Sequence, residues 1–230
     1  MDRTNETEQK AALVTGGSNG IGYAISLKLA TNGIFVFIAD VLPPERTHPN
    51  IKFIACDVTG KTDVDNLYAT LAAHSRLPDI LVLNAGKGIH EKLTEGDPEK
   101  WTSVISLNIM GALRCIRAFV PAMEKKPHAD IVFVSSISAF QPYAYGGIYG
   151  PSKAALEMIA QTLRLEISPD VRITIVSAGL TLSSMTKGSA SYDHAALSAD
   201  DIADDVWYAL GKHRKSVINK IVTRPFDQDF

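Results

Sequence analysis

Short apolar runs rich in β-branched residues alternate along the chain with longer segments whose apolar residues recur at helical spacing. The runs that predict strands are 11–15, 34–39, 51–56, 79–84, 130–136, 171–177 and 218–223. The segments that predict helices are 20–32, 62–75, 99–125, 152–167 and 199–212. This alternation is typical of a parallel sheet, because the crossover between two parallel strands is usually a helix.

The strand-like runs are apolar without interruption, which indicates a sheet that is buried on both faces. The pattern therefore predicts an α/β fold, a doubly wound parallel sheet of about seven strands with helices on both sides. The run at 218–223 is expected to close one edge. The segment 41–50 stands where a further helix is expected, but its three prolines predict that this helix is vestigial or absent.

Length and composition indicate the size of the core and the classes of partner. A chain of 230 residues with 46% apolar residues and a formal net charge of −2 is long enough for one substantial core, so we expect a single domain over 1–230. The charge balance offers no basic surface for nucleic acid. No apolar run approaches the ~18 residues that span a membrane, and the polar N-terminus lacks the core of a signal peptide. We expect a cytoplasmic protein that binds neither nucleic acid nor membranes, with 1–9 as a flexible tail.

The cysteines and histidines do not indicate a metal site. Cys56 and Cys115 lie far apart in apolar surroundings and form no CxxC motif, which favours two reduced structural thiols over a disulfide. The six histidines show neither HxxxH nor HExxH spacing. The sequence therefore predicts no bound metal.

A glycine-rich loop, TGGSNGIG, joins the first predicted strand to the first predicted helix. Gly16, Gly20 and Gly22 would let backbone N–H groups approach a pyrophosphate, and the helix N-terminus adds unpaired donors. The loop matches neither GxGxxG nor the GxxxxGK[ST] of phosphate-loop NTPases, and a tight turn is the simpler alternative. Asp40, which ends the second predicted strand, could accept hydrogen bonds from a ribose or be an ordinary loop aspartate. The two features together favour a nucleotide.

The stretch IYGPSK places Tyr149 and Lys153 one turn apart at the start of a predicted helix. An amphipathic helix explains such a pair on its own. A phenol, however, has a pKa near ~10, and a neighbouring ammonium would stabilise its phenolate. Pro151 is tolerated in a first turn and predicts a helix start near Tyr149.

With TGGSNGIG at 15–22, NAG at 84–86, Asn108, Ser136, and Tyr149 with Lys153, the chain resembles the short-chain dehydrogenase/reductase family over nearly its whole length. The resemblance implies a Rossmann fold and an NAD(P)-dependent oxidoreductase that moves hydride between nicotinamide and a small carbonyl or alcohol substrate. Tyr149 would be the general acid/base.

The resemblance also implies roles for individual residues. Lys153 would hold the nicotinamide ribose, Ser136 would bind the reacting oxygen, and Asn108 would hold a water that links Lys153 to solvent. The implied cofactor-binding residues are Gly16, Ser18, Asn19, Gly20, Ile21, Gly22, Asp40, Asp57, Val58, Asn84, Ala85, Gly86, Tyr149, Lys153, Gly179 and Ser183. For Asp57 a helix N-cap, and for 84–86 a tight turn, are alternative roles.

One stretch departs from the family pattern. The family usually has Pro-Gly followed by threonine after the sixth strand, whereas this chain has Ala178-Gly179 and then Ser183. The serine keeps the hydroxyl, while the alanine predicts a looser backbone and somewhat weaker cofactor binding.

NAD is the expected cofactor, with NADP not excluded. Asp40 would repel a 2′-phosphate, and Asn19 is neutral where relatives that prefer NADP often carry a basic residue. Arg46, in the loop 41–50, could instead swing toward a 2′-phosphate and favour NADP.

The substrate is expected to be a small polar carbonyl or alcohol under a mobile lid at 183–198. The candidate substrate contacts are His90, Ser138, Gln141, Tyr143, Tyr145 and Met185.

The resemblance suggests a homodimer or homotetramer built on the helices 99–125 and 152–167. Ala112, Cys115, Ile116 and Phe119 would either form part of an apolar outer stripe or face the sheet. The alternative function is a non-catalytic dinucleotide-binding sensor or scaffold. The intact set of Asn108, Ser136, Tyr149 and Lys153 argues against that alternative.

Overall fold

The structure, a computed structural model, describes residues 9–182 and 196–227. The strands are β1 (Ala11–Thr15), β2 (Phe35–Asp40), β3 (Ile51–Ala55), β4 (Ile80–Leu83), β5 (Ala129–Ser136), β6 (Val171–Ala178) and β7 (Lys220–Thr223). The helices are α1 (Gly20–Thr31), α2 (Lys61–Ala73), α3 (Pro98–Ile105), α4 (Ala112–Met123), α5 (Tyr149–Glu166) and α6 (Ala199–Leu210), with a π-helix η1 (Ser106–Gly111) and a 3-10 turn η2 (Ile137–Ala139).

All seven strands are parallel and form one sheet in the order β3-β2-β1-β4-β5-β6-β7. The order reverses between β1 and β4, so the chain winds outward from this pair in both directions. Ligands of such sheets bind beyond the carboxyl ends of the strands at this switch point. The predicted fold class is confirmed, and β7 closes an edge as expected.

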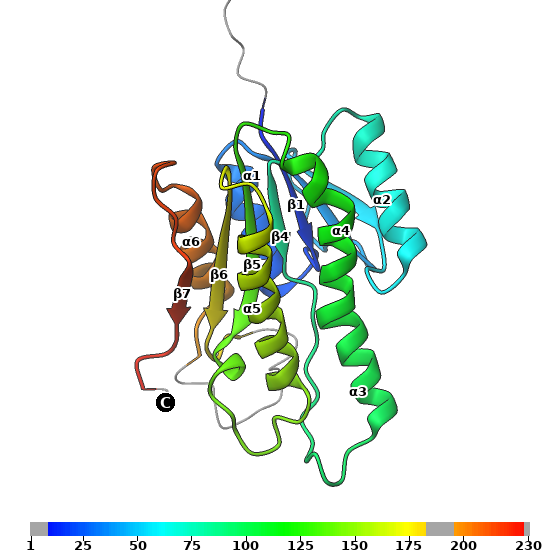
Figure 1. Cartoon of the computed structure of the whole chain (residues 1–230), viewed down its shortest axis with the longest axis vertical. Helices are drawn as coiled ribbons and strands as arrows, with labels where there is room; N and C mark the ends of the chain where they lie inside the picture. Colours follow the sequence, from blue (N-terminus) through cyan, green and yellow to red (C-terminus); the bar gives the residue numbers. More distant parts are fainter. Residues whose placement is uncertain (1–8, 183–195, 228–230) are drawn as a thin grey trace, which may run out of the picture.

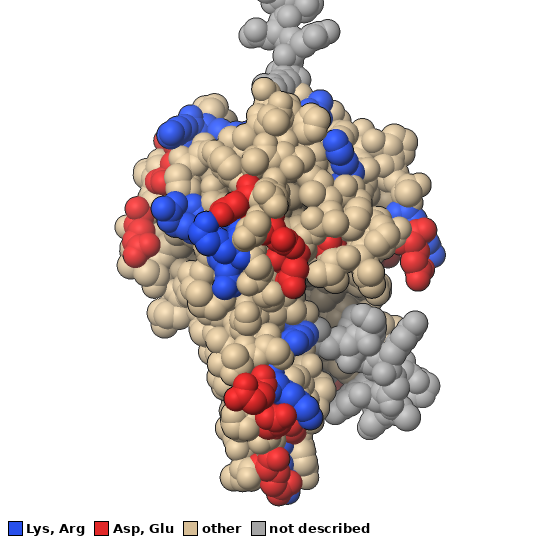
Figure 2. Space-filling model, turned by 90° about the vertical axis from the view of Figure 1, so that its right-hand side faces the viewer, with Lys and Arg blue, Asp and Glu red and all other residues tan. Residues whose placement is uncertain are grey.

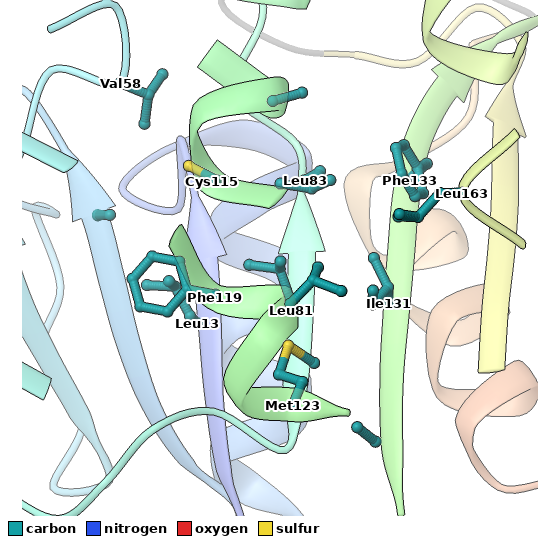
Figure 3. Close-up of a cluster of buried hydrophobic side chains, with 14 of the residues drawn as sticks. Leu13, Val58, Leu81, Leu83, Cys115, Phe119, Met123, Ile131, Phe133 and Leu163 are labelled. Carbon is teal, nitrogen blue, oxygen red and sulfur yellow. The ribbon is translucent and has the colours of Figure 1, made fainter. Parts of the chain in front are cut away.

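Two apolar layers cover the two faces of the sheet (Figure 1). One layer packs α2, α4 and α5 on the sheet, and Figure 3 shows Phe119, Met123 and Cys115 of α4 lying over Leu81 and Leu13. The other layer packs α1 and α6 on the opposite face. The inner strands β1, β2, β4, β5 and β6 are buried on both sides, which explains their uninterrupted apolar sequences, whereas the edge strands β3 and β7 are partly exposed.

The segment 99–125, expected as one helix, is divided into α3, η1 and α4. The π-helical hydrogen bonding of η1 widens one turn of the helix. By length and composition alone, the stretch Pro98–Met123 could cross a membrane, since an 18-residue window within it has a mean hydropathy of 1.4, although charged residues interrupt it. Its inward face, with Phe119 and Met123, nevertheless packs on the sheet as a core helix does.

The predicted apolar outer stripe on this helix is wrong. Ala112, Cys115 and Phe119 are buried against the sheet, and Ile116 packs against the same core. The alternative stated above, that these residues face the sheet, is the observed one. Burial raises the pKa of the Cys56 thiol to about 11 and that of Cys115 to about 12, so both stay protonated at neutral pH.

The segment 41–50 contains no helix, as its prolines predict. Most of the predicted tail at 1–9 and most of the predicted lid at 183–198 lie outside the described residues. On the face seen in Figure 2, acidic and basic side chains lie next to one another.

Candidate active site

The glycine loop after β1 depends on its glycines for physical reasons. Gly16 and Gly20 have φ angles of +61° and +52°, which favour glycine. A Cβ on Gly22 would lie 2.1 Å from the carbonyl oxygen of Gly16, so only glycine fits there. Asn19 caps α1 directly after this turn.

The loop is held against the turn that follows β4. Asn84 Nδ2 donates to the carbonyl oxygens of Thr15 (3.0 Å) and Gly16 (2.8 Å). Thr15 Oγ1 accepts from the backbone N–H groups of Asn84 (3.1 Å) and Ala85 (3.2 Å). The Asn84 amide therefore braces the glycine loop. Sequence reasoning missed Thr15, whose only signal is a polar residue at the end of an apolar strand.

Asp40 lies beside the same loop. Its carboxylate accepts hydrogen bonds from the backbone N–H groups of Ser18 (3.0 Å) and Val41 (2.7 Å). The buried hydroxyl oxygen of Ser18 has no hydrogen-bond partner among the described residues. Arg46 is exposed and does not line the cavity described next, and its carbonyl oxygen accepts from the Tyr23 hydroxyl at 3.2 Å.

A cavity of about 920 Å³ runs along the carboxyl ends of the strands. Most predicted site residues line it: Gly16, Asn19, Gly20, Ile21, Gly22, Asp40, Asp57, Val58, Asn84, Ala85, Gly86, Ser136, Tyr149, Lys153 and Gly179, with the substrate candidates His90, Ser138, Gln141 and Tyr143. Ser18, Asn108 and Tyr145 do not line it. Ser183 and Met185 lie outside the described residues.

Tyr149 begins α5, and Lys153 follows one turn later. The ammonium nitrogen of Lys153 donates to the carbonyl oxygen of Val134 at 2.9 Å and lies 5.9 Å from the centroid of the Tyr149 ring. A hydrogen bond joins the Tyr149 hydroxyl to Ser136. The Ser136 hydroxyl oxygen also accepts from the backbone N–H of Ser138 at 3.1 Å, which fixes its orientation.

Burial has opposite consequences for these two groups. It raises the pKa of the Tyr149 phenol, and the hydrogen bond with Ser136 opposes that rise. It lowers the pKa of Lys153 to about 8, and the carboxylate of Glu157 opposes that fall. The Lys153 ammonium is therefore a stronger acid than that of an ordinary lysine, and it loses its charge near pH 8.

Glu157, one turn beyond Lys153, is a buried acidic residue that sequence reasoning missed. Its carboxylate accepts from the Ser177 hydroxyl at 2.7 Å and pairs with Lys220 of β7 at 2.7 Å. The Lys220 ammonium also lies 4.0 Å from the centroid of the Phe140 ring. The only sign of Glu157 in the sequence is a charged residue in the middle of the inward face of α5.

Asn108 is fully buried in η1. Its Nδ2 donates to the Lys87 carbonyl oxygen (2.9 Å) and to the Ser152 hydroxyl (2.9 Å), and its Oδ1 accepts from the Lys87 backbone N–H (2.9 Å). Both N–H bonds of the amide are thus committed to the protein. A Cβ on Gly86 would lie 3.2 Å from Asn108 Oδ1 and 3.5 Å from Lys153 Nζ, so the three residues adjoin.

Two loops form the wall near Tyr149. They meet in a bridge between Glu91 and Gly146, and the His90 and Tyr143 rings lie 6.2 Å apart. Tyr145 instead points to solvent, 57% exposed with Lys92 5.7 Å from its ring, so the expectation that it contacts substrate finds no support.

Two further sequence expectations concern the backbone. Asp57 accepts from the Thr59 N–H at 2.8 Å, while α2 is capped by Gly60, so the helix N-cap alternative for Asp57 is wrong. Ala178 pairs with Thr223 of β7 and with Ser136 of β5, and these strand contacts hold the backbone where the family proline is missing. Within residues 9–182 and 196–227, no group of three or more His, Cys, Asp or Glu side chains is placed to hold a metal.

Known proteins resemble this chain throughout its length. The family model described as short chain dehydrogenase matches residues 10–193. An uncharacterized oxidoreductase of Staphylococcus epidermidis is 32% identical over 228 residues, which cover 96% of this chain and 99% of that protein. The crystal structure of serine dehydrogenase from Escherichia coli is 26% identical, with a TM-score of 0.85 over 96% of this chain and 100% of that one.

A closed form of serine dehydrogenase complexed with NADP+ is also similar, at 26% identity and a TM-score of 0.87 over 96% of each chain. The family match covers the glycine loop, the turn after β4 and the Tyr149–Lys153 pair, which the structure brings together around one cavity. The chain belongs to the short-chain dehydrogenase family of oxidoreductases.

Proposed function

We propose that this protein is an NAD-preferring alcohol dehydrogenase or carbonyl reductase that acts on a small carbonyl or alcohol substrate, with Tyr149 as general acid/base. The observation that carries the proposal is the hydrogen bond between Tyr149 and Ser136, beside the Lys153 ammonium and on the wall of the cavity that the glycine loop also lines.

The residues around the cavity fit a nicotinamide dinucleotide. The glycine loop lines the cavity and leaves no room for a Cβ at Gly22, and α1 begins at the loop, which brings the N–H groups of its first turn to the cavity wall. Donors of this kind bind a pyrophosphate. Asp40 is placed to accept hydrogen bonds from an adenosine ribose, while Lys153 would hold the nicotinamide ribose. The nicotinamide, when bound, supplies or accepts the hydride.

The chain's own residues would handle the proton. In the reducing direction the Tyr149 hydroxyl donates its proton to the substrate oxygen, and Ser136 donates a hydrogen bond to the same oxygen. The Lys153 ammonium stabilises the phenolate that remains. Asn108 would hold a water through the free lone pair of Oδ1, since both of its N–H bonds are used.

A panel of carbonyl compounds, followed by the absorbance of reduced NAD and NADP, tests the proposal. Serine and NADP belong in the panel, because a structural neighbour is a serine dehydrogenase and one such structure holds NADP+. Tyr149→Phe removes one hydroxyl and should lower turnover roughly 10²-fold or more, with unchanged cofactor affinity. Near-normal turnover by this variant would exclude Tyr149 as the acid/base.

A non-catalytic sensor or scaffold remains the second candidate, and it predicts cofactor binding with no turnover on any member of the panel. The intact Ser136, Tyr149 and Lys153 favour an enzyme. We place the protein in the cytoplasm on the sequence expectation above.

For assembly we propose a homodimer or homotetramer through the outer faces of the α3–α4 segment and α5. The apolar residues that are exposed there are Ile105, Met110, Met158 and Leu165. They replace the buried residues expected from sequence. Light scattering that gave the monomer mass of 24.9 kDa at micromolar concentration would contradict this assembly.

A further inference from the structure

The charged side chains that line the cavity are separated by sign along its length. Asp40 ends β2 and Asp57 follows β3, whereas Lys87 follows β4 and Lys153 contacts β5. Four strand spacings separate β3 from β5 in the sheet, and each is about 4.8 Å. Of the described residues that line the cavity, none in the half that holds Tyr149 is a carboxylate.

The backbone of Lys87 is held in place in the part of the cavity that Lys87 and Lys153 line. Asn108 hydrogen-bonds both backbone groups of Lys87, and Asn108 is itself fully buried. Gly86, the preceding residue, lies so close to Lys153 that its Cβ would be 3.5 Å from that ammonium. From Asn84 to Lys87 the chain therefore leads away from the glycine loop and toward the catalytic lysine.

The Lys87 ammonium makes no ion pair or hydrogen bond with any residue in 9–182 or 196–227. Lys153, in contrast, donates to Val134 and has Glu157 one turn away. His90, three residues further along the chain, also lines this part of the cavity. A half-buried cation without a counter-ion attracts anions into a cleft and is stabilised when one binds.

We propose that Lys87 binds a carboxylate of the substrate, so that small hydroxy acids and oxo acids are the preferred substrates of this site. A single ammonium matches a monoanionic carboxylate, whose reacting oxygen then lies at Tyr149. The inference rests on the proposed function, since it names the substrate class of that same site.

Matched pairs of substrates separate charge from size. 3-Hydroxybutyrate and its methyl ester share the reacting alcohol and differ in the charge of the far end. The unmodified protein should favour the acid, and Lys87→Met should raise KM for the acid by about tenfold or more while kcat changes little. The ester should be unaffected, and Lys87→Arg should keep the preference. Lys92→Met is the control, because Lys92 belongs to the same loop but pairs with Glu95.

Three results would overturn the inference: equal use of acid and ester by the unmodified protein, equal losses for both in Lys87→Met, or tighter binding of a phosphate ester than of the acid. Weaker NADH binding by Lys87→Met would also overturn it, by assigning the ammonium to the pyrophosphate.

Turnover is not required for the test. Ligand-observed NMR of 3-hydroxybutyrate and its ester with the NAD+-saturated protein compares their affinities directly. Binding of the acid that is unchanged in Lys87→Met would overturn the inference even in a protein that turns over neither compound. Lack of turnover with intact, Lys87-dependent acid binding would instead contradict only the proposed function.

Discussion

Asn108 and Lys87 exchange two hydrogen bonds, in which the buried amide of Asn108 satisfies both the N–H and the carbonyl oxygen of Lys87, each at 2.9 Å. A third bond, to the Ser152 hydroxyl, ties the amide to the first turn of α5, where Ser152 in turn donates to the Tyr149 carbonyl oxygen at 2.7 Å. One side chain thus connects η1, the turn after β4 and the helix that carries Tyr149.

Asn108→Ala should therefore lower the stability of the protein as well as its turnover. The change leaves the backbone groups of Lys87 and the Ser152 hydroxyl without their partner, and each buried unsatisfied group costs about 1–3 kcal/mol. We expect a loss of roughly 2–4 kcal/mol in the free energy of unfolding, measured by urea denaturation. Asn66→Ala, at an exposed position of α2, is the control. Equal stability of the two variants would mean that the Asn108 bonds contribute little.

Gly22→Ala should abolish cofactor binding with a smaller effect on the fold. The added methyl group would lie 2.1 Å from the Gly16 carbonyl oxygen and 2.4 Å from Asn84 Nδ2, so the glycine loop must move away from its brace. Fluorescence titration with NADH should show a loss of affinity of about 100-fold or more, equivalent to ~2.7 kcal/mol. Gly211→Ala, where the nearest atom is 3.4 Å away, is the matched control and should bind normally.

The fold was more predictable from the sequence than the hydrogen bonds that hold the site residues in place. Apolar runs marked all seven strands: burial on both faces requires such runs in the five inner strands, and the partly exposed edge strands β3 and β7 keep a shorter apolar pattern. Prolines ruled out a helix at 41–50. The π-turn at η1 left no such mark, since 99–125 keeps an apolar pattern through it.

The glycine loop and the Tyr149–Lys153 pair were predictable because their chemistry depends on spacing within one segment. Thr15, Glu157 and Ser152 were not, because their roles arise from hydrogen bonds to segments distant in sequence. The same reason explains why the outer stripe of α4 was wrong and why the expectation for Tyr145 finds no support: sequence does not settle which way a side chain faces.

The pH profile of carbonyl reduction should fall on the alkaline side near pH 8. The pKa of Lys153 is lowered to about 8 by burial, so its positive charge is present below that pH and is lost above it. Reduction needs that charge beside Tyr149, and kcat/KM should decrease accordingly.

Glu157→Gln should move this alkaline limb to lower pH, because the Glu157 carboxylate raises the pKa of Lys153. Glutamine still accepts from Ser177, and Lys220 is partly exposed, so the fold should tolerate the change. Glu166→Gln, at the exposed end of α5, is the control. If the alkaline limb fell at the same pH in both variants, the interaction between Lys153 and Glu157 would not control the pH profile.

The choice of cofactor should depend on Asp40. Two backbone N–H groups, of Ser18 and Val41, fix its carboxylate beside the glycine loop, where a 2′-phosphate would meet a like charge. Arg46, the basic residue that could neutralise such a phosphate, does not line the cavity. We expect NADH to bind more tightly than NADPH by at least about tenfold, equivalent to ~1.4 kcal/mol.

Asp40→Ala should narrow or reverse that ratio, because it removes the hydrogen-bond acceptor for the ribose hydroxyls together with the repulsion. Asp65→Ala, on the exposed face of α2, should leave it unchanged. Fluorescence titration of both reduced cofactors measures the ratio in each variant. Equal affinities, or tighter NADPH binding by the unmodified protein, would overturn the NAD preference and leave Asp40 as a brace of the glycine loop through its bond from Ser18.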